Sequence, residues 1–359
     1  MKRQAIALQD IAERGNLLLA VHKAARAKHL RPAVAGFLAD LDARLATLAA
    51  SILDRSAPVG AYRSFTIHDP KRRQIHAACF ADRALHHAIL NLAEPRFERM
   101  LVDSSYACRP GKGVHAAVAR AQHNLRRFDW VVQVDVDGYF PAICHTRLKA
   151  LLATRFKGDG FLALLGRIID NGGTQGSGVP EQALQKRGLP IGSLTSQHFA
   201  NAYLDAGDRW LLAQSTVRAH VRYMDDILWW CDSRAAAQAT LAAFAGFLRD
   251  ERGLTLKSSA RVVASGAGLA YCGFRVRPGV VLPSQRKLTR YRQHAARIEH
   301  ACAVGAADDR DLQRAAASAH AALAHCHSAG FRQAYWQQYP SVYDACSGPT
   351  LQAHGGAGL

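Results

Sequence analysis

Residues 222–226 read Arg-Tyr-Met-Asp-Asp and lie inside an apolar stretch that runs from Val221 to Trp230. Two short apolar runs that meet at adjacent carboxylates predict a β-hairpin with Asp225 and Asp226 at its tip. Two neighbouring carboxylates in a partly buried place repel each other and lose hydration, which is unfavourable. A bound divalent cation relieves that conflict, because carboxylate oxygens are the ligands that Mg²⁺ prefers. The sequence therefore predicts a metal site at the tip of a hairpin.

A third carboxylate precedes this hairpin, in the segment Val131–Phe140, which reads Val-Val-Gln-Val-Asp-Val-Asp-Gly-Tyr-Phe. Strand alternation places Val132, Val134 and Val136 on one face and Asp135 on the other. Three acidic groups from two strands can hold the pair of metal ions used in in-line nucleotidyl transfer. We therefore predict that Asp135, Asp225 and Asp226 are catalytic and bind metal. Asp226 is the weaker ligand, because successive strand side chains point to opposite faces.

The composition of the chain indicates a polyanionic partner. Its 359 residues include 46 Lys and Arg but only 28 Asp and Glu, which gives a formal net charge of +18 and a pI near 10. Such a field attracts nucleic acid. No run is long enough to span a membrane, no signal peptide is evident, and the eight cysteines form no Cys-x-x-Cys pair. We expect a cytoplasmic protein with reduced thiols and no membrane partner.

Six motifs resemble those of the reverse transcriptases, in the family's order, and the resemblance covers roughly residues 60–340. Tyr223–Asp226 resembles the catalytic hairpin of that family, and Asp135–Ile143 resembles its first catalytic strand. The other four resemble two fingers motifs, the segment under the templating base pair and the primer-grip hairpin, in this order: Pro70–Arg73, Tyr106–Gly113, Gly188–Gln197 and Ala270–Val276.

This resemblance implies an α+β fold, a right-hand polymerase with fingers and palm (an antiparallel palm sheet plus helices) and a C-terminal helical thumb. We expect an N-terminal helical extension over 1–58, the fingers and palm of a reverse transcriptase core over 59–284, a helical thumb over 285–345 and a disordered tail over 346–359. The patterns predict hairpins over 60–75 and 266–282 and helices over 80–97, 114–128, from near 193 and over 235–251.

The resemblance also assigns roles around the carboxylates. Two Mg²⁺ ions, with Mn²⁺ as a substitute, are the expected cofactors. Arg73 and Arg109 are expected to bind the triphosphate through their planar guanidinium forks, and Phe140 is expected to exclude the 2′-hydroxyl of ribonucleotides. Lys257 and Arg261 compete for the place of a lysine that protonates pyrophosphate in many family members. Contacts with the primer or template are assigned to Tyr223, Gly273 and Phe274.

The segment Ile191-Gly-Ser-Leu-Thr-Ser-Gln197 narrows the resemblance further. Most reverse transcriptases read Gln-Gly-x-x-x-Ser-Pro here, and the Ile and Gln substitutions resemble enzymes of diversity-generating retroelements. That resemblance implies error-prone copying of a template RNA into cDNA, with errors opposite adenine, as in mutagenic retrohoming. Ile191 and Gln197 are expected beside the nascent base pair. The implied partners are template RNA, cDNA, deoxynucleoside triphosphates and a small basic accessory protein.

Three alternatives stay open at this point. A retron-like or antiviral-defence reverse transcriptase with a dedicated non-coding RNA would share the same core chemistry. A group II intron maturase would need more C-terminal length for an RNA-binding domain. A catalytically dead RNA-binding scaffold is opposed by the intact set of Asp135, Asp225 and Asp226.

Overall fold

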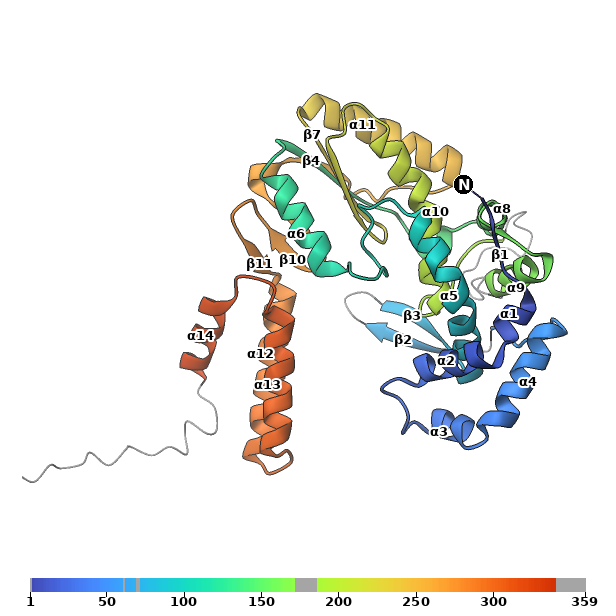
Figure 1. Cartoon of the computed structure of the whole chain (residues 1–359). Coiled ribbons are helices and arrows are strands. Elements are labelled where there is room, and N and C mark those ends of the chain that lie inside the picture. Colours follow the sequence, from blue (N-terminus) through green and yellow to red (C-terminus); the bar gives the residue numbers. More distant parts are fainter. Residues whose placement is uncertain (1, 61, 69–71, 172–185, 340–359) are drawn as a thin grey trace, which may run out of the picture. The chain divides into compact units, whose positions relative to one another are not determined.

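The computed structural model describes residues 2–60, 62–68, 72–171 and 186–339, without the side chains of residues 72–74. The chain, drawn in Figure 1, divides into two compact units. Each unit has its own cluster of buried apolar side chains. The first unit comprises residues 1–113 and 130–262, and the second comprises residues 114–129 and those from 263 onward.

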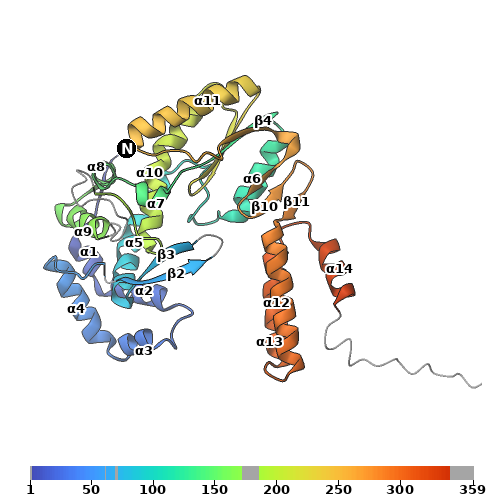
Figure 2. The same cartoon turned by 180° about the vertical axis from the view of Figure 1, so that it is seen from behind.

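Three of the four N-terminal helices of the first unit pack against the long helix α5 (Phe80–Met100), and the fourth, α4 (Leu41–Leu53), packs against the other three, as Figure 2 shows from behind. Asn16 fastens them: its side-chain amide donates to the carbonyl oxygen of Ala88 at 3.1 Å, and Asn91 Nδ2 donates to Asn16 Oδ1 at 2.9 Å. These helices are therefore part of the first unit's core. They are α1 (Leu8–Ala12), α2 (Arg14–Ala25), α3 (Pro32–Ala39) and α4 (Leu41–Leu53).

A short parallel ladder joins the start of the chain to its middle, where β1 pairs with β5. Gly158, directly after β5, has a φ of 117°, and a Cβ atom there would lie 2.5 Å from the carbonyl oxygen of Ile6. Only glycine fits this close approach, since the backbone is also in a region that other residues rarely adopt. The two strands are β1 (Gln4–Ala5) and β5 (Phe156–Lys157).

The expected hairpin near residue 60 is confirmed as an antiparallel pair of strands, β2 and β3. Its register runs from Tyr62 opposite Ala78 to His68 opposite Arg72. The strands are β2 (Tyr62–His68) and β3 (Arg72–Ala78).

The central sheet of the first unit has the strand order β6-β7-β4-β8, and β7 is antiparallel to both β6 and β4. Its middle strands are fully buried: Val132, Val134, Ile227 and Trp229 are each 0–1% exposed. Helices α10 and α11 pack against this sheet. The strands are β4 (Trp130–Asp135), β6 (Ala219–Tyr223), β7 (Asp226–Cys231) and β8 (Arg261–Ala264), of which β8 begins at the end of the first unit and continues past residue 262.

The first unit contains further helices between and after its strands, and α10 and α11 are the ones that cover the central sheet. Helix α11 begins after Ser233, whose hydroxyl accepts from the backbone N–H of Ala236 at 3.2 Å. They are α7 (Tyr139–Ala142), α8 (His145–Ala153), α9 (Asp159–Asp170), α10 (Leu194–Leu212), α11 (Arg234–Phe247) and a π-helical turn (Leu248–Arg252).

In its described residues, 114–129 and 263–339, the second unit combines a small antiparallel sheet, in the order β11-β10-β9, with four helices. Tyr291, Ala295, Leu323 and Tyr335 form its helical core. Its elements are α6 (Val114–Leu125), a 3₁₀ turn (Ser265–Ala267), β9 (Leu269–Tyr271), β10 (Phe274–Val276), β11 (Val281–Pro283), α12 (Gln285–Ala303), α13 (Asp309–Leu323) and α14 (Ala329–Gln338).

The predicted α+β class and the mixed sheet and helices of a right-hand polymerase are confirmed. The expected hairpin over 266–282 is a three-stranded sheet, because β11 adds to the β9–β10 pair. The predicted domain limits at 58, 284 and 345 stay predictions; the compact units divide the chain elsewhere. The predicted tail over 346–359 lies outside the described residues. None of the described helices combines the length and apolarity needed to cross a bilayer.

Candidate active site

The acidic turn, which we define as residues 223–226, joins β6 to β7. Tyr223 pairs with Asp226 across the hairpin, so Met224 and Asp225 are the two residues at the bend. Met224 has a φ of 56°. This left-handed conformation is uncommon for a residue with a side chain, and it persists only where the surroundings hold it.

Strand β4 brings the upstream carboxylate to this turn. Asp135, the last residue of β4, lies opposite Asp226 in the register of the sheet. The backbone N–H of Val136 donates to the carbonyl oxygen of Asp225 at 3.3 Å. The fold therefore brings the three predicted carboxylates together at one end of the central sheet. Strand β4 pairs with β7, which is not its neighbour in the sequence, and the sequence alone does not reveal this pairing.

The negative charges of these three carboxylates are only partly neutralised by positive charges nearby. Burial first, and the charge of Asp135 second, raise the pKa of Asp225. Burial raises the pKa of Asp226 to about 7, against a hydrogen bond from Gln133 and with the help of both other carboxylates. Within the described part of the chain, Lys257 alone forms an ion pair with this group, and its Nζ lies 2.5 Å from Asp135 Oδ1. The cluster is therefore short of positive charge.

The suitability of these residues for a metal ion depends on their arrangement and on their donor atoms. No group of three or more His, Cys, Asp or Glu side chains in the described ranges is arranged as a metal centre. The donor chemistry nevertheless fits: the carboxyl groups of Asp135 and Asp225 are close enough to share a hydrogen bond. Asp226 Oδ1 is buried and has no hydrogen-bond partner in the described structure. Hard, uncompensated oxygens of this kind suit Mg²⁺ or Mn²⁺.

A cleft of about 230 Å³ opens beside these carboxylates. Arg261 lines it and donates from Nη2 to Gln133 Oε1 at 2.8 Å, whereas Lys257 contacts Asp135 directly. Of the two residues that compete for the lysine role, Lys257 is therefore the one that touches a predicted catalytic carboxylate. The lining residues are Gln133, Val134, Asp135, Asp226, Ser259 and Arg261.

Arg109, predicted to bind triphosphate, is an internal anchor of its loop in this structure. Its guanidinium pairs with Glu98 at 2.6 Å, and Nη1 donates to the carbonyl oxygens of Val102 and Ser105 at 2.6 and 2.7 Å. Only 6% of the side chain is exposed. A triphosphate contact would need these bonds to be exchanged, and it stays a prediction. Arg73 lies on β3 opposite Ile67, and its side chain is outside the described part.

The residues predicted beside the base pair occupy one continuous region. The carbonyl oxygen of Ile191 accepts from the backbone N–H of His76, on β3, at 2.9 Å. Gln197, in the first turn of α10, lies 4.0 Å from the Cys108 sulfur, measured from its Oε1. The carbonyl oxygen of Phe140 accepts from Leu189 N–H, two residues before Ile191, at 3.0 Å. Both Phe140 and Ile191 are half-buried, and their roles beside the base pair stay predictions.

The predicted primer and template contacts fall in both units. Tyr223 is half-buried on β6 in the first unit. Gly273, with a φ of 78°, turns the β9–β10 pair in the second unit. Phe274 is 1% exposed there, and Lys287 Nζ lies 4.3 Å from the centre of its ring. Phe274 therefore packs in a core and offers no exposed face in this structure.

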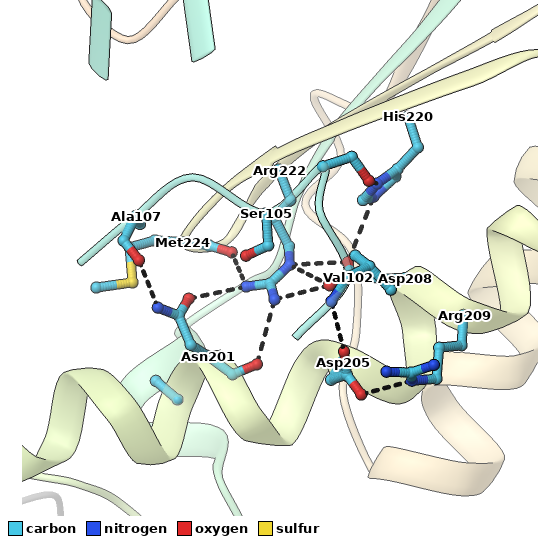
Figure 3. A network of polar contacts seen from close by, with 12 residues as sticks. Val102, Ser105, Ala107, Asn201, Asp205, Asp208, Arg209, His220, Arg222 and Met224 are labelled. Atoms are coloured by element: carbon cyan, nitrogen blue, oxygen red, sulfur yellow. Dashed lines mark hydrogen bonds and ion pairs between the residues drawn. The ribbon is translucent and has the colours of Figure 1, made fainter. Parts of the chain in front are cut away.

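Sequence reasoning gave no role to Arg222, which immediately precedes the acidic turn. Its side chain is 0% exposed and forms an ion pair with Asp208, also 0% exposed, at 2.7 Å (Figure 3). The available signal was an arginine within an apolar strand, because a buried charge is retained only with a partner. The partner is fourteen residues away in the sequence, on α10, and only the fold identifies it.

An antiparallel sheet with three carboxylates at its end, a preceding two-stranded hairpin and covering helices has the architecture of a polymerase palm. Residues 68–274, more than half of the chain, match the family described as reverse transcriptase (RNA-dependent DNA polymerase). The chain therefore belongs to the reverse transcriptase family, as its motifs predicted.

Individual relatives cover only part of this chain. The "Uncharacterized 91 kDa protein in cob intron" of Schizosaccharomyces pombe is 24% identical over 160 residues, which is 45% of this chain and 18% of that protein. Protein YkfC of Escherichia coli is 27% identical over 159 residues, 43% of this chain and 39% of that protein. The group II intron-encoded protein LtrA of Lactococcus lactis is 25% identical over 142 residues, 40% and 23% respectively. The matches thus span less than two-fifths of each relative.

Solved structures give a more distant similarity. Telomerase from Candida albicans, in complex with a TWJ fragment of telomeric RNA, aligns with a TM-score of 0.47 at 9% identity, covering 66% of this chain and 50% of that chain. Apo telomerase from Candida tropicalis aligns with a TM-score of 0.46 at 10% identity, covering 66% and 53% respectively.

Proposed function

We propose that this protein copies an RNA template into DNA by two-metal nucleotidyl transfer. The observation that carries the proposal is the cluster of Asp135, Asp225 and Asp226, with raised pKa values at the latter two and one paired cation among the described residues. In the reaction, the primer 3′-oxygen forms a bond to the α-phosphorus of a deoxynucleoside triphosphate. The bond from that phosphorus to pyrophosphate breaks, and the hydroxyl proton passes to solvent or a nearby base.

The residues of the first unit divide this work among themselves. Asp135 and Asp225 would hold Mg²⁺ or Mn²⁺, which when bound lowers the pKa of the 3′-hydroxyl and neutralises charge on the leaving group. Lys257 provides a proton donor at the same carboxylates. Phe140 would discriminate against a 2′-hydroxyl, and Arg73 remains a candidate for the triphosphate.

Template and primer would be bound through positive charge. In the second unit, a cavity of about 480 Å³ on α12 and α13 is lined by Lys287, Arg290 and Arg297. With a formal net charge of +18 for the chain, these groups favour a phosphate backbone over a neutral ligand. The expected affinity for RNA therefore falls steeply as salt rises.

The test is synthesis of DNA on a primed RNA template with purified protein, with and without Mg²⁺. Asp225→Asn removes a metal ligand without adding negative charge, so incorporation should fall by about a thousandfold or more, equivalent to at least ~4 kcal/mol of transition-state energy. RNA binding should change less than about twofold, because the phosphate contacts are elsewhere.

Asp137→Asn is the matched control. Asp137 is exposed and follows the same strand, and its replacement should leave synthesis near the wild-type rate. Undiminished synthesis by Asp225→Asn would show that the carboxylate cluster is not the catalytic centre.

We further propose that the enzyme belongs to a diversity-generating retroelement. Ile191 and Gln197 carry this proposal, and both lie in the segment clamped between β3 and the Cys108 loop. An aliphatic side chain at 191 cannot form the hydrogen bonds of the glutamine common in the family. Loss of one or two such contacts would reduce discrimination against wrong pairs. A small basic accessory protein is the proposed partner; a defence or retron-like enzyme is the alternative.

Sequencing cDNA made from a defined RNA, with the accessory protein present where required, tests this assignment. Errors opposite adenine should exceed errors opposite the other bases by about tenfold or more. Ile191→Gln should lower adenine errors more than it changes total synthesis. Leu30→Gln, the same type of change at a side chain 98% exposed, should alter neither. A low, uniform error rate in the wild type would favour the defence or retron-like alternative.

A further inference from the structure

The guanidinium of Arg222 forms hydrogen bonds both with residues of helix α10 and with the acidic turn (Figure 3). Its Nε donates to both carboxylate oxygens of Asp208, at 2.8 and 2.9 Å. Nη2 contacts Asp208 again and the carbonyl oxygen of Asn201, while Nη1 donates to Asn201 Oδ1 at 3.1 Å and to the carbonyl oxygen of Met224 at 3.0 Å. All five N–H groups of the side chain thus have an acceptor.

The bond to Met224 falls at the strained position of the turn. The carbonyl of Met224 belongs to the peptide group that leads into Asp225, and Met224 itself has a φ of 56°. A left-handed residue other than glycine costs free energy, so neighbouring contacts must hold it. Among the described contacts, Arg222 supplies a charged hydrogen bond at this carbonyl, which fixes the orientation of the peptide that carries Asp225.

The backbone of Arg222 holds a second segment in register. Its N–H donates to the carbonyl oxygen of Ser104, and its own carbonyl accepts from the N–H of Tyr106, both at 2.9 Å. Asn201 completes the connection, because its Nδ2 donates to the carbonyl oxygen of Ala107 at 2.7 Å. Arg222 therefore connects three parts of the first unit: helix α10, the acidic turn and the loop that leads to Arg109.

Asp208 keeps the guanidinium in place. Burial alone would raise the pKa of Asp208, but the charge of Arg222 and the contact with His220 outweigh burial and lower it to about 2. His220 Nε2 lies 3.3 Å from Asp208 Oδ1, and Ser104 Oγ lies 2.8 Å from His220 Nδ1. The acceptor for Arg222 is therefore an ionised carboxylate with further support behind it.

We propose that Arg222 is a positioning residue for nucleotidyl transfer: it holds the Met224–Asp225 peptide so that the Asp225 carboxylate stays beside Asp135. This role rests on the proposed function. Arg222 touches no reacting group, and it acts through the geometry of the turn. Asp208 anchors one end of its guanidinium, and the bonds to Asn201 and Met224 transmit that anchor to the active site.

Arg222→Lys separates positioning from folding. Lysine keeps a positive charge opposite Asp208, but a single ammonium cannot donate to Asp208, Asn201 and Met224 in the arginine's planar arrangement. In single-turnover synthesis on a primed RNA, the rate constant should fall about tenfold or more while the amplitude of active enzyme is unchanged. The Mg²⁺ concentration for half-maximal rate should rise. A role in folding alone would lower the amplitude and leave both the rate constant and the Mg²⁺ requirement unchanged, which would overturn the proposal.

Two further variants guard against ambiguity. Arg218→Lys is the matched control, since Arg218 pairs with Asp232 at 2.5 Å near the start of the same strand, with half of each side chain exposed; it should behave as wild type. Asn201→Ala keeps the Arg222–Asp208 pair and removes two hydrogen bonds, the one that Asn201 Oδ1 accepts from Arg222 and the one that its Nδ2 donates to the carbonyl oxygen of Ala107. It should lower the rate constant by about threefold. An unchanged rate constant in folded Asn201→Ala and Arg222→Lys would refute positioning.

Hydrogen exchange provides a readout that does not depend on DNA synthesis. Peptides that cover residues 219–231 should exchange faster in Arg222→Lys than in the wild type, with the increase confined to the acidic turn. Arg218→Lys should show no increase there. Equal exchange at the turn in Arg222→Lys and in the wild type would overturn the proposal. If Arg222→Lys does exchange faster at the turn but the wild type makes no DNA, only the proposed function is refuted.

Discussion

The β6–β7 hairpin lies between two acidic environments of opposite character, Asp208 on helix α10 and the carboxylates of the acidic turn. Behind the β6 strand, Asp208 is fully buried and is matched by Arg222 at 2.7 Å, which lowers its pKa to about 2. At the tip, Asp225 and Asp226 are only half-buried, yet their pKa values are raised. The deeper carboxylate is therefore the more easily ionised one.

The difference lies in compensation, not in depth. Burying a carboxylate costs on the order of several kcal/mol in lost hydration unless a charge and hydrogen bonds replace the water. Arg222 supplies both for Asp208. The carboxylates at the tip repel each other, and within the described chain they have one paired cation, Lys257. Uncompensated charge of this kind marks functional sites more often than scaffolds.

The largest effect on stability is expected when the buried ion pair between Asp208 and Arg222 is broken. Asp208→Asn leaves the Arg222 charge buried without an ionised partner, so the free energy of unfolding should fall by about 3–5 kcal/mol. Chemical denaturation followed by circular dichroism measures this change. Asp232→Asn is the control at an exposed pair, where the loss should stay below about 1 kcal/mol. Equal losses at the two positions would mean that the buried pair contributes no more than a surface one.

A smaller effect of opposite sign is expected at the tip. Because the pKa of Asp225 is raised in the folded protein, its ionised form destabilises the fold at neutral pH, and Asp225→Asn should raise the free energy of unfolding. Added Mg²⁺ should stabilise the wild type, by about 1.4 kcal/mol at ten times the dissociation constant, and the variant much less. Differential scanning calorimetry with and without Mg²⁺ measures both. A loss of stability in Asp225→Asn without metal would contradict the idea of uncompensated repulsion.

Much of this comparison could be predicted from the sequence. Strand alternation identified Asp135, and the apolar runs around Asp225 located the turn, because both signals are local. The α+β class followed from the same patterns and from the family motifs. Helices α5, α6, α10 and α11 begin within a few residues of the predicted positions.

The remaining features depend on partners that are distant in the sequence. Asp208 reads as one polar residue on an amphipathic helix until the fold places it against Arg222. Arg109 reads as an exposed loop arginine until Glu98, eleven residues earlier, is found 2.6 Å away. Charge pairing across elements follows from tertiary packing, which neither periodicity nor motif spacing contains.

The smallest expected effect, on the pH dependence of stability, concerns His86, a titratable side chain that is buried in its neutral form. His86 is 0% exposed on α5, and its Nδ1 lies 3.1 Å from Ser193 Oγ, next to the segment that carries Ile191. Among the described residues, its partners are the hydroxyls of Ser193 and Thr195 and none is charged. Burial lowers the pKa of His86 to about 4. Asp208 is therefore paired with Arg222, Asp225 is repelled by the charge of Asp135, and His86 is neutral.

The sign of the pH effect follows from that lowered pKa. Between pH 6.5 and pH 4, the ordinary and the folded values, the unfolded chain binds a proton at His86 that the folded chain does not. Stability therefore rises with pH across this window and is lost as the pH falls through it. His86→Gln should make the free energy of unfolding less dependent on pH, by at most about 1.4 kcal/mol per pH unit. Burial also lowers the pKa values of His87 and His198 to about 4, so a slope should remain.

Denaturant unfolding at several pH values between 4 and 7.5 measures this slope, and the slope, not the absolute stability, is the informative quantity. His86→Gln also alters a hydrogen bond, which shifts the whole curve without changing its dependence on pH. His29→Gln, at an exposed side chain, is the control and should reproduce the wild-type slope. If the His86→Gln and wild-type curves run parallel, His86 is protonated equally in the folded and unfolded states, and burial in this polar cluster does not hold it neutral.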